Sequence, residues 1–249
     1  MATNKVSTTG HTTNHEKLIN FLDKYLKKIM ISFIVIILAV IAVVGGVFFR
    51  EYKVSEELKA YLNLAGEFDT QLMNISKKYQ PAAGQENDET AIDKDALEKD
   101  KTAAVKDYAA KLEVLTEKSH WGYVSHNGYY IAGGLYFSVK DYQKSLDLYL
   151  KAAKKVDNDV FKILALQQAA VCYEWLNKND EAMKIYQDLE KKFPKSDSLD
   201  RIYYDLGRMY QLKGDKVKAE EYFTNVIKNH SSSVFAKKSQ ERVMLLGSK

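Results

Sequence analysis

The sequence predicts an all-α protein with a single transmembrane helix followed by an α-solenoid, which is a stack of helix pairs. An uncharged apolar stretch covers residues 29–49, and only two prolines occur in the chain, which favours long uninterrupted helices. A pattern of small and aromatic residues also recurs three times with a fixed offset of 37 residues. Internal repetition at such a period is typical of solenoids, which bind partners more often than they catalyse reactions.

The apolar stretch is long enough to cross a bilayer. Residues 29–49 contain no charge over 21 positions, and at about 1.5 Å per residue such a helix matches a hydrocarbon core of about 30 Å. The alternatives are a buried core helix and a cleaved signal peptide. An isolated stretch near a terminus has little to bury it, and the run ends in Phe48, Phe49 and Arg50 rather than in the small residues of a cleavage site. The stretch is therefore predicted to be a single-pass signal anchor.

The charges beside the span predict its orientation. Five lysines and two acidic residues precede it, whereas the two cations just after it, Arg50 and Lys53, are offset by three glutamates. The positive-inside tendency places the N-terminus in the cytoplasm and the large C-terminal part across the membrane. In a bacterium with two membranes that part lies in the periplasm, so we expect a protein of the cell inner membrane.

The predicted cytoplasmic tail, residues 1–28, divides into two parts. Residues 1–14 are polar and rich in threonine, and we expect them to be disordered. Residues 15–28 have apolar side chains on one helical face with lysines beside them. They form either a short basic amphipathic helix on the anionic membrane surface or an extension of the membrane helix.

Residues 50–118 are predicted to form a helical stalk and an irregular first hairpin. Apolar residues recur at helical spacing over 51–79 and again from about 93 to 118. Between these segments, Pro81 and Gly84 among polar residues indicate a loop. The many acidic residues and lysines of the second segment indicate a solvated helix face rather than a metal site.

The repeats are predicted over residues 119–249, with a capping helix of polar outer face at the C-terminus. In each repeat, two small residues lie twelve positions apart, and an aromatic residue follows each of them by three or four positions. We expect the small residues where the two helices of a hairpin approach most closely, with the rings beside them. The three sets are Gly133, Tyr136, Ser145 and Tyr149; Ala170, Tyr173, Ala182 and Tyr186; and Gly207, Tyr210, Ala219 and Phe223. The predicted turns are Lys140-Asp141, Asn179-Asp180 and Gly214-Asp215.

This pattern resembles the tetratricopeptide repeat over residues 126–232. The terminal proline of that repeat is present only in the second copy, as Pro194, and the period of 37 exceeds the usual period of about 34. The wider layout of basic tail, single span, helical stalk and divergent repeats resembles the ancillary SecYEG translocon subunit family. That resemblance implies a membrane-anchored scaffold whose periplasmic repeats bind translocon, chaperone or client proteins. The alternative is a structural subunit of an envelope machine such as a flagellar motor accessory assembly.

The first helix of each pair is expected to line the concave face, where a partner would bind. Aromatic rings beside arginines suit an amphipathic helix or an extended peptide, although these rings could instead only pack between repeats. The predicted groove residues are Tyr130, Phe137, Gln167, Trp175, Arg201, Tyr204 and Arg208. The Lys and Asn with which cytosolic chaperone-binding members clamp a carboxylate are replaced here by Tyr130 and Gly134.

The sequence gives no support to catalysis. His120 and His126 share no helical face, and the lone cysteine, Cys172, is expected to be a buried, inert thiol. No phosphate-binding loop, nucleophile elbow or zinc-protease motif occurs. The formal charge of +4 does not call for nucleic acid. We therefore predict a protein that is not an enzyme, with no cofactor or metal, whose partners are proteins and the membrane.

Overall fold

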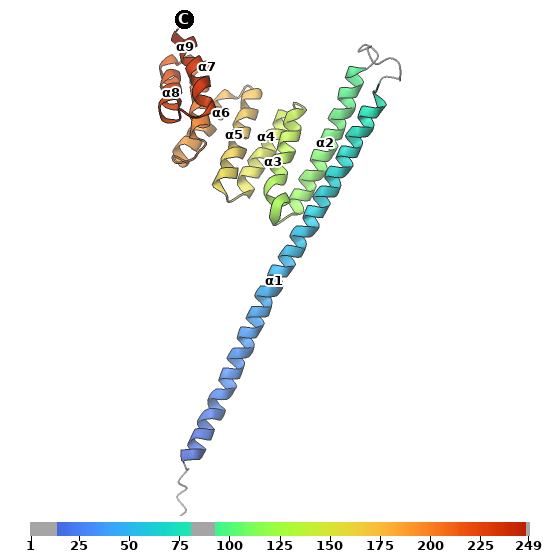
Figure 1. The fold of residues 1–249 in the computed structure, drawn as a ribbon, viewed down its shortest axis with the longest axis vertical. Coiled ribbons are helices and arrows are strands. Elements are labelled where there is room, and N and C mark those ends of the chain that lie inside the picture. The colour runs from blue at the N-terminus through green and yellow to red at the C-terminus, as the bar shows by residue number, and fades with distance from the viewer. Residues whose placement is uncertain (1–13, 81–92, 248–249) are drawn as a thin grey trace, which may run out of the picture. The chain divides into compact units, whose positions relative to one another are not determined.

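The computed structural model describes residues 14–80 and 93–247, and the regular structure in these ranges is helical, which confirms the predicted all-α class (Figure 1). The predicted disorder before residue 14 and the predicted loop around Pro81 and Gly84 lie outside the described residues. The chain divides into two compact units, Met1–Lys53 and Val54–Lys249. The helices are α1 (Asn14–Lys78), α2 (Lys94–Lys118), α3 (Gly122–Ser138), α4 (Tyr142–Lys155), α5 (Asp159–Trp175), α6 (Asn179–Lys192), α7 (Leu199–Leu212), α8 (Lys216–Asn229) and α9 (Val234–Gly247).

The described residues of the first unit, 14–53, form the N-terminal part of α1. Its large apolar side chains from Ile31 to Phe49 are all exposed, and α1 is long and apolar enough, by length and composition, to cross a membrane. Residues 15–28 continue into the same helix without a break. Residues 15–28 and the predicted span thus belong to one helix, and the choice between a surface-bound helix and an extension of the span stays a prediction.

The second unit begins with a hairpin formed by α1 after Val54 and α2. The rings of Phe68 and Tyr108 stack between these helices, with centroids 4.4 Å apart and planes 7° apart. At the far end, the Lys78 ammonium and the Tyr79 hydroxyl both donate to Asp100, at 2.8 and 2.9 Å. Tyr108 lies 37 positions before Ser145, so this hairpin has a bulky ring where the later hairpins have a small residue. The first hairpin thus departs from the pattern of small residues that the later hairpins share.

In the next three hairpins, α3–α4, α5–α6 and α7–α8, the predicted small residues are buried between the two helices. The Ser145 hydroxyl donates to the Gly133 carbonyl at 2.8 Å. A Cβ added to Gly133 would lie 3.2 Å from the Tyr149 ring, and one added to Gly207 would lie 2.6 Å from the Phe223 ring. In α3–α4 and α7–α8 the helices are thus as close as their small residues allow, because a ring of the second helix packs directly on the first. In α5–α6 the corresponding Ala170, Ala182 and Tyr186 are all fully buried.

The turns of the three hairpins share one backbone conformation. Lys140, Asn177 and Gly214 have φ of +61°, +59° and +80° and lie at the repeat offset of 37. In each turn the residue after the left-handed one donates its backbone N–H to the carbonyl of a tyrosine in the first helix, as in a Schellman cap. These tyrosines are the repeat residues Tyr136, Tyr173 and Tyr210, and the distances are 2.9–3.0 Å. The second turn therefore centres on Asn177, not on the predicted Asn179-Asp180, which lies in the first turn of α6. The prediction from the polar pair Asn179-Asp180 was wrong because the position of the turn is set by the residue with positive φ, Asn177, and not by the polarity of its neighbours.

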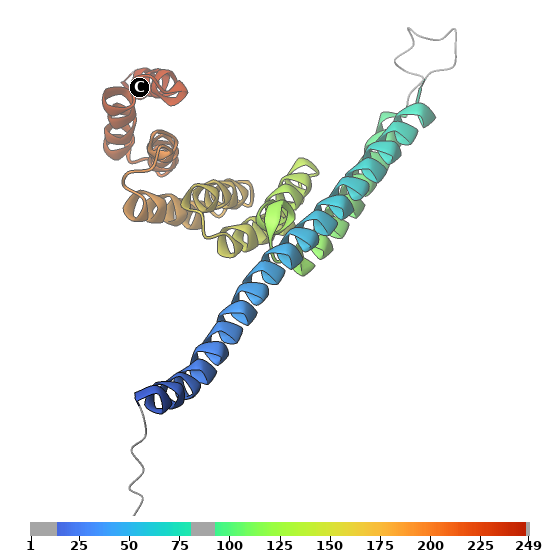
Figure 2. The ribbon, with the colours of Figure 1, turned by 60° about the horizontal axis from the view of Figure 1, so that its bottom comes forward.

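The hydrophobic core runs from hairpin to hairpin. One cluster joins α2, α3 and α4 to α5, and another joins α5 and α6 to α7. Figures 1 and 2 show α3 to α9 in succession, each beside its neighbours. Helix α9 ends the stack with Ala236 and Ser239 buried against it. It exposes apolar side chains at both ends, Val234 at its start and Met244 and Leu245 near its end, so the predicted polar cap is only partly polar.

Candidate functional site

The predicted groove residues belong to α3, α5 and α7, and the structure gathers several of them at two neighbouring hairpin junctions. The first is an aromatic patch formed by Phe137 of α3, Tyr142 of α4 and Trp175 of α5. The second is an ion cluster in which α5, α6 and α7 meet. Its members are Glu174, Tyr186, Asp205 and Arg208.

The aromatic patch holds a largely exposed indole in a fixed orientation. The Trp175 ring stacks on the Tyr142 ring at 5.1 Å between centroids with planes 18° apart. Phe137 contacts both rings edge-on, at 5.2 Å from Tyr142 and 6.4 Å from Trp175. Trp175 is nevertheless 58% exposed. A rigid aromatic side chain with an open surface provides a large contact area at a low entropic cost, so this patch suits protein binding.

Tyr142 is a member of the patch that sequence counting missed. It is the first residue of α4, directly after Asp141, whose side chain caps the helix by accepting from the Lys144 N–H. Positions on second helices were not assigned to the binding face. An aromatic residue directly after the turn is the signal that could have identified it.

The ion cluster ties three helices together. One terminal nitrogen of Arg208 donates to both carboxylate oxygens of Glu174 at 2.9 Å and to Asp205 at 3.1 Å. The Tyr186 hydroxyl donates to Glu174 at 2.9 Å. The side chains of Asp205, Glu174 and Arg208 are 8%, 15% and 27% exposed. The predicted binding residue Arg208 is thus engaged within the protein and serves the packing of α5 against α7.

Burial decides the electrostatics of this cluster. Burial opposes the charge of Arg208, but Asp205 and Glu174 outweigh it and raise the pKa of the guanidinium. For Asp205 burial is the larger effect, and it raises the pKa of the carboxyl despite Arg208 and Arg201. Arg201 lies at 3.6 Å from the second oxygen of Asp205. Removing one partner would leave buried charge uncompensated, so the cluster is a structural element rather than an open binding site.

The remaining predicted groove residues are mostly covered. The Tyr130 ring packs edge-on against Tyr149 at 5.2 Å, and Tyr204 lies against Phe223 and Phe235 at 5.7 and 5.3 Å. These rings pack between helices, as the alternative interpretation of the aromatics held. Gln167 is only 1% exposed, so the expectation that it lines an open surface does not hold. The assignment of a binding face to the first helices stays a prediction, and Gln167 cannot belong to the exposed part of such a face.

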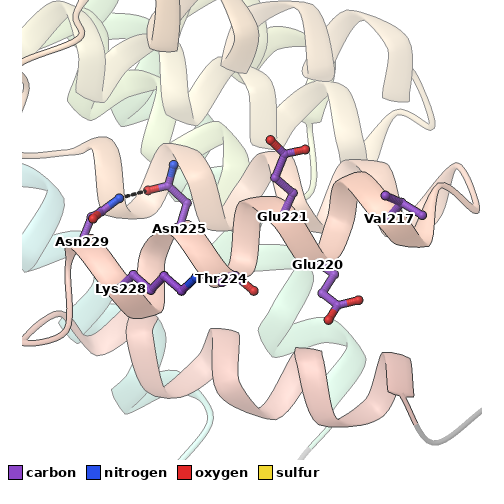
Figure 3. A pocket seen from close by; sticks show the side chains of 7 residues that line it. All are labelled: Val217, Glu220, Glu221, Thr224, Asn225, Lys228 and Asn229. Carbon is purple, nitrogen blue, oxygen red and sulfur yellow. Dashed lines mark hydrogen bonds between the residues drawn. The ribbon is translucent and has the colours of Figure 1, made fainter.

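Two pockets lie on the surface of the described helices. Figure 3 shows one whose lining side chains all come from α8, with Glu220 and Glu221 pointing to opposite sides and an Asn225–Asn229 hydrogen bond. A second, of about 430 Å³, lies between the start of α5 and the α6–α7 connection around Pro194. Within residues 14–80 and 93–247, no group of three or more His, Cys, Asp or Glu side chains could hold a metal ion.

Comparisons with known proteins identify the repeats. A family model of the tetratricopeptide repeat matches residues 164–196 and 202–233. Among solved structures, a crystal structure of MamA has 21% sequence identity and a TM-score of 0.44, covering 68% of this chain and 91% of that chain. A second MamA structure, labelled AMB-1, has 16% identity and a TM-score of 0.41, covering 74% and 94%. A Podosopora anserina putative kinesin light chain with nearly identical TPR-like repeats has 13% identity and a TM-score of 0.44, covering 74% and 96%. No match is found among the curated proteins.

The assignment of the repeats depends on the two matched segments and on the hairpin geometry. These segments cover α5–α6 and α7–α8, and α3–α4 has the same turn and the same small-residue contact. Tetratricopeptide repeats are protein-interaction modules. The hairpin stack is therefore a scaffold of the protein-binding class.

Proposed function

We propose that this protein is a scaffold anchored in the cell inner membrane, with its repeats on the periplasmic side. The observation that carries the proposal is that one uninterrupted helix, α1, contains an apolar segment whose large side chains from Ile31 to Phe49 are all exposed and continues into the first hairpin. An apolar helix surface of this length is stable in a bilayer and costly in water. The lysines before residue 29 support a cytoplasmic N-terminus.

The partner class that we propose is a translocon, chaperone or client protein, bound through an amphipathic helix or an extended peptide. The aromatic patch supports this role because Trp175 offers a pre-oriented ring, and exposed tryptophans are often the residues that dominate a protein interface. The ion cluster keeps α5 and α7 in register beside it. Arg208 therefore supports the binding surface without contributing directly to it.

The topology can be tested with a thiol reagent that does not cross the inner membrane. Ser231 is exposed in the α8–α9 connection and Lys17 is exposed near the start of α1. Ser231→Cys should be labelled in cells with a permeabilised outer membrane, and Lys17→Cys only after the inner membrane is disrupted. The unmodified chain is the blank, because its one cysteine, Cys172, is buried. The opposite labelling pattern would contradict the proposed orientation.

The binding surface can be tested by crosslinking and capture from detergent-solubilised membranes. Trp175→Ala should lose the partner, whereas Leu212→Ala should retain it. Leu212 is the matched control because it lies 37 positions after Trp175 and is 64% exposed. Equal capture by both variants would exclude the aromatic patch. Translocon subunits or chaperones among the captured proteins would support the proposal, and stoichiometric envelope-machine subunits would replace it with the structural role.

A further inference from the structure

An exposed lysine lies in each of the two turns beside the aromatic patch. In the α3–α4 turn, Lys140 follows Phe137 by three residues and precedes Tyr142 by two. In the α5–α6 turn, Lys178 follows Trp175 by three residues. The patch is therefore flanked by one cation from each of the two hairpins that form it.

The backbone conformation of Lys140 lowers the stability of the fold. Its φ is +61°, in the left-handed region where a residue with a Cβ is strained. The other two turns have Asn177 and Gly214 at this position, and these are the residue types that adopt the conformation most readily. A strained residue that packing does not require points to a role in binding.

The second lysine, Lys178, occupies the N-cap of α6, where the other two hairpins have an aspartate. The offset of 37 residues aligns it with Asp141 and Asp215. The Asp141 side chain accepts from the N–H of Lys144, and the Asp215 side chain accepts from the N–H of Lys218. The side chain of Lys178 makes no capping hydrogen bond, and its charge is unfavourable at the positive end of the helix dipole. This lysine therefore also lowers stability.

The charges around the two turns favour an anionic ligand. Within residues 14–80 and 93–247, neither lysine forms an ion pair. Two carboxylates beside the turns are engaged elsewhere, Asp141 with Lys106 at 3.1 Å and Asp180 with Lys213 at 2.6 Å. Glu181, in the first turn of α6, is exposed, so two lysines against one glutamate leave an excess of one positive charge. Such a surface is complementary to carboxylates that lie beside an apolar group.

From these observations we infer that the aromatic patch and the two lysines bind an acidic peptide segment of a partner protein, in which carboxylates flank an apolar side chain. The apolar side chain packs on the exposed ring of Trp175, and the carboxylates pair with Lys140 and Lys178. The inference rests on the proposed protein-binding role of the patch. It gives a reason why two turns contain a residue that lowers stability, whereas the third turn, with Gly214 and Asp215, contains none.

The test restores the residue types of the third turn, with Lys140→Gly and Lys178→Asp. A fluorescently labelled peptide with a central Leu-Phe pair between runs of glutamate is titrated with the full chain in a neutral detergent, and fluorescence anisotropy measures binding. Lys195→Asp is the matched control, because Lys195 is exposed and its change of charge equals that of Lys178→Asp. It lies beyond the other end of α6, about 20 Å from the patch, which exceeds the Debye length of about 10 Å in 0.1 M salt.

Each turn variant should weaken binding of the glutamate peptide about threefold or more in 0.1 M salt, and the control should leave it unchanged. Lys178→Asp should at the same time raise the midpoint of thermal unfolding by about 2–4 °C, because a capping aspartate is restored. Glu181→Gln should strengthen binding, because it removes a carboxylate that repels the ligand. A peptide with glutamine in place of glutamate should bind more weakly than the acidic peptide.

The outcomes separate this inference from the role of the patch on which it rests. Loss of binding in Trp175→Ala with full binding in either lysine variant keeps the patch and overturns the inference. Full binding in Trp175→Ala contradicts the patch and the inference together. The inference is also overturned if the unmodified chain does not bind the glutamate peptide, if it binds the glutamine peptide equally, or if inorganic polyphosphate binds as well. Because the measurement is made in detergent, its result does not depend on the proposed topology.

Discussion

Two neighbouring junctions of the stack use equivalent positions in chemically different ways. Phe137, in the first repeat, contacts Trp175, whereas Glu174, which lies 37 positions later, binds Arg208. The backbone frame is the same at both, because the small residues and the left-handed turn residues recur at the same offset. The repeat therefore fixes the frame and leaves the side chains on its surface free to differ. One junction leaves an aromatic ring open to a partner, and the other buries charge.

The largest effect should come from the ion cluster. Replacing Arg208 by Met keeps most of the volume but leaves Glu174 and Asp205 buried without their cation, which should cost about 3 kcal/mol. Urea unfolding of the full chain in detergent, followed by circular dichroism, measures the loss. Lys213→Met removes the exposed pair with Asp180 and is the control. Equal losses in the two variants would mean that the cluster contributes no more than a surface ion pair.

The glycines at the two helix contacts should respond differently to alanine. A Cβ on Gly207 would lie 2.6 Å from the fully buried Phe223 ring, so Gly207→Ala should destabilise the protein by about 1–2 kcal/mol. A Cβ on Gly133 would lie 3.2 Å from the Tyr149 ring, so this ring has to move less than the Phe223 ring. The better helix propensity of alanine, up to about 1 kcal/mol, offsets the cost of that small movement. Gly133→Ala should therefore be nearly neutral in the same unfolding measurement. The reverse order would show that the first hairpin is the more tightly closed.

The junction between α2 and the first hairpin should be sensitive to acid. Burial tends to raise the pKa of Glu113, but Lys144 and Lys151, each at 2.8 Å, outweigh it and lower the pKa below its ordinary value of 4.5. Such a carboxylate stabilises the folded state above the unfolded pKa, and the contribution is lost as the pH falls through the folded pKa.

Glu113→Gln should thus cost about 1 kcal/mol at neutral pH, and the difference from the unmodified chain should close as the pH falls below 4.5. Unfolding curves recorded across this range measure the difference. Asp188→Asn, which removes an exposed pair with Lys192, should show little effect at any of these pH values. A difference that persists in acid would assign the effect of Glu113 to packing rather than to charge.

The smallest effect should come from the turns. Lys140→Gly should stabilise the protein by about 0.5 kcal/mol, because a lysine is strained at φ +61° and glycine is not, although glycine makes the unfolded chain more flexible. Asn177→Gly should change little, since asparagine tolerates this conformation. Thermal unfolding of both variants under one condition gives the comparison. A larger gain at Asn177 than at Lys140 would contradict the explanation by strain.

Much of the frame could be predicted from residue spacing. The positions of the small and aromatic residues gave the hairpin contacts, and the second stalk helix was expected to begin near residue 93, where Asp93 in fact caps α2. The turn at Asn177 was missed because its signal is a backbone conformation that a neighbouring polar pair obscured. At the candidate site, the predicted residues Phe137 and Trp175 lie in the aromatic patch. Tyr142 was missed because it belongs to α4, the second helix of its hairpin, and only first helices were assigned to the binding face.

By itself, the sequence determined the class of each segment, because helical period, apolar length and the recurrence of small residues are local properties of the chain. Only the tertiary structure decided which side chains remain open. Gln167 and Trp175 were both assigned to the binding face, yet one is buried and the other is 58% exposed. Exposure depends on how deeply the next hairpin packs on the helix. The pairing of Arg208 with Glu174, 34 positions away, likewise exists only once the hairpins are stacked.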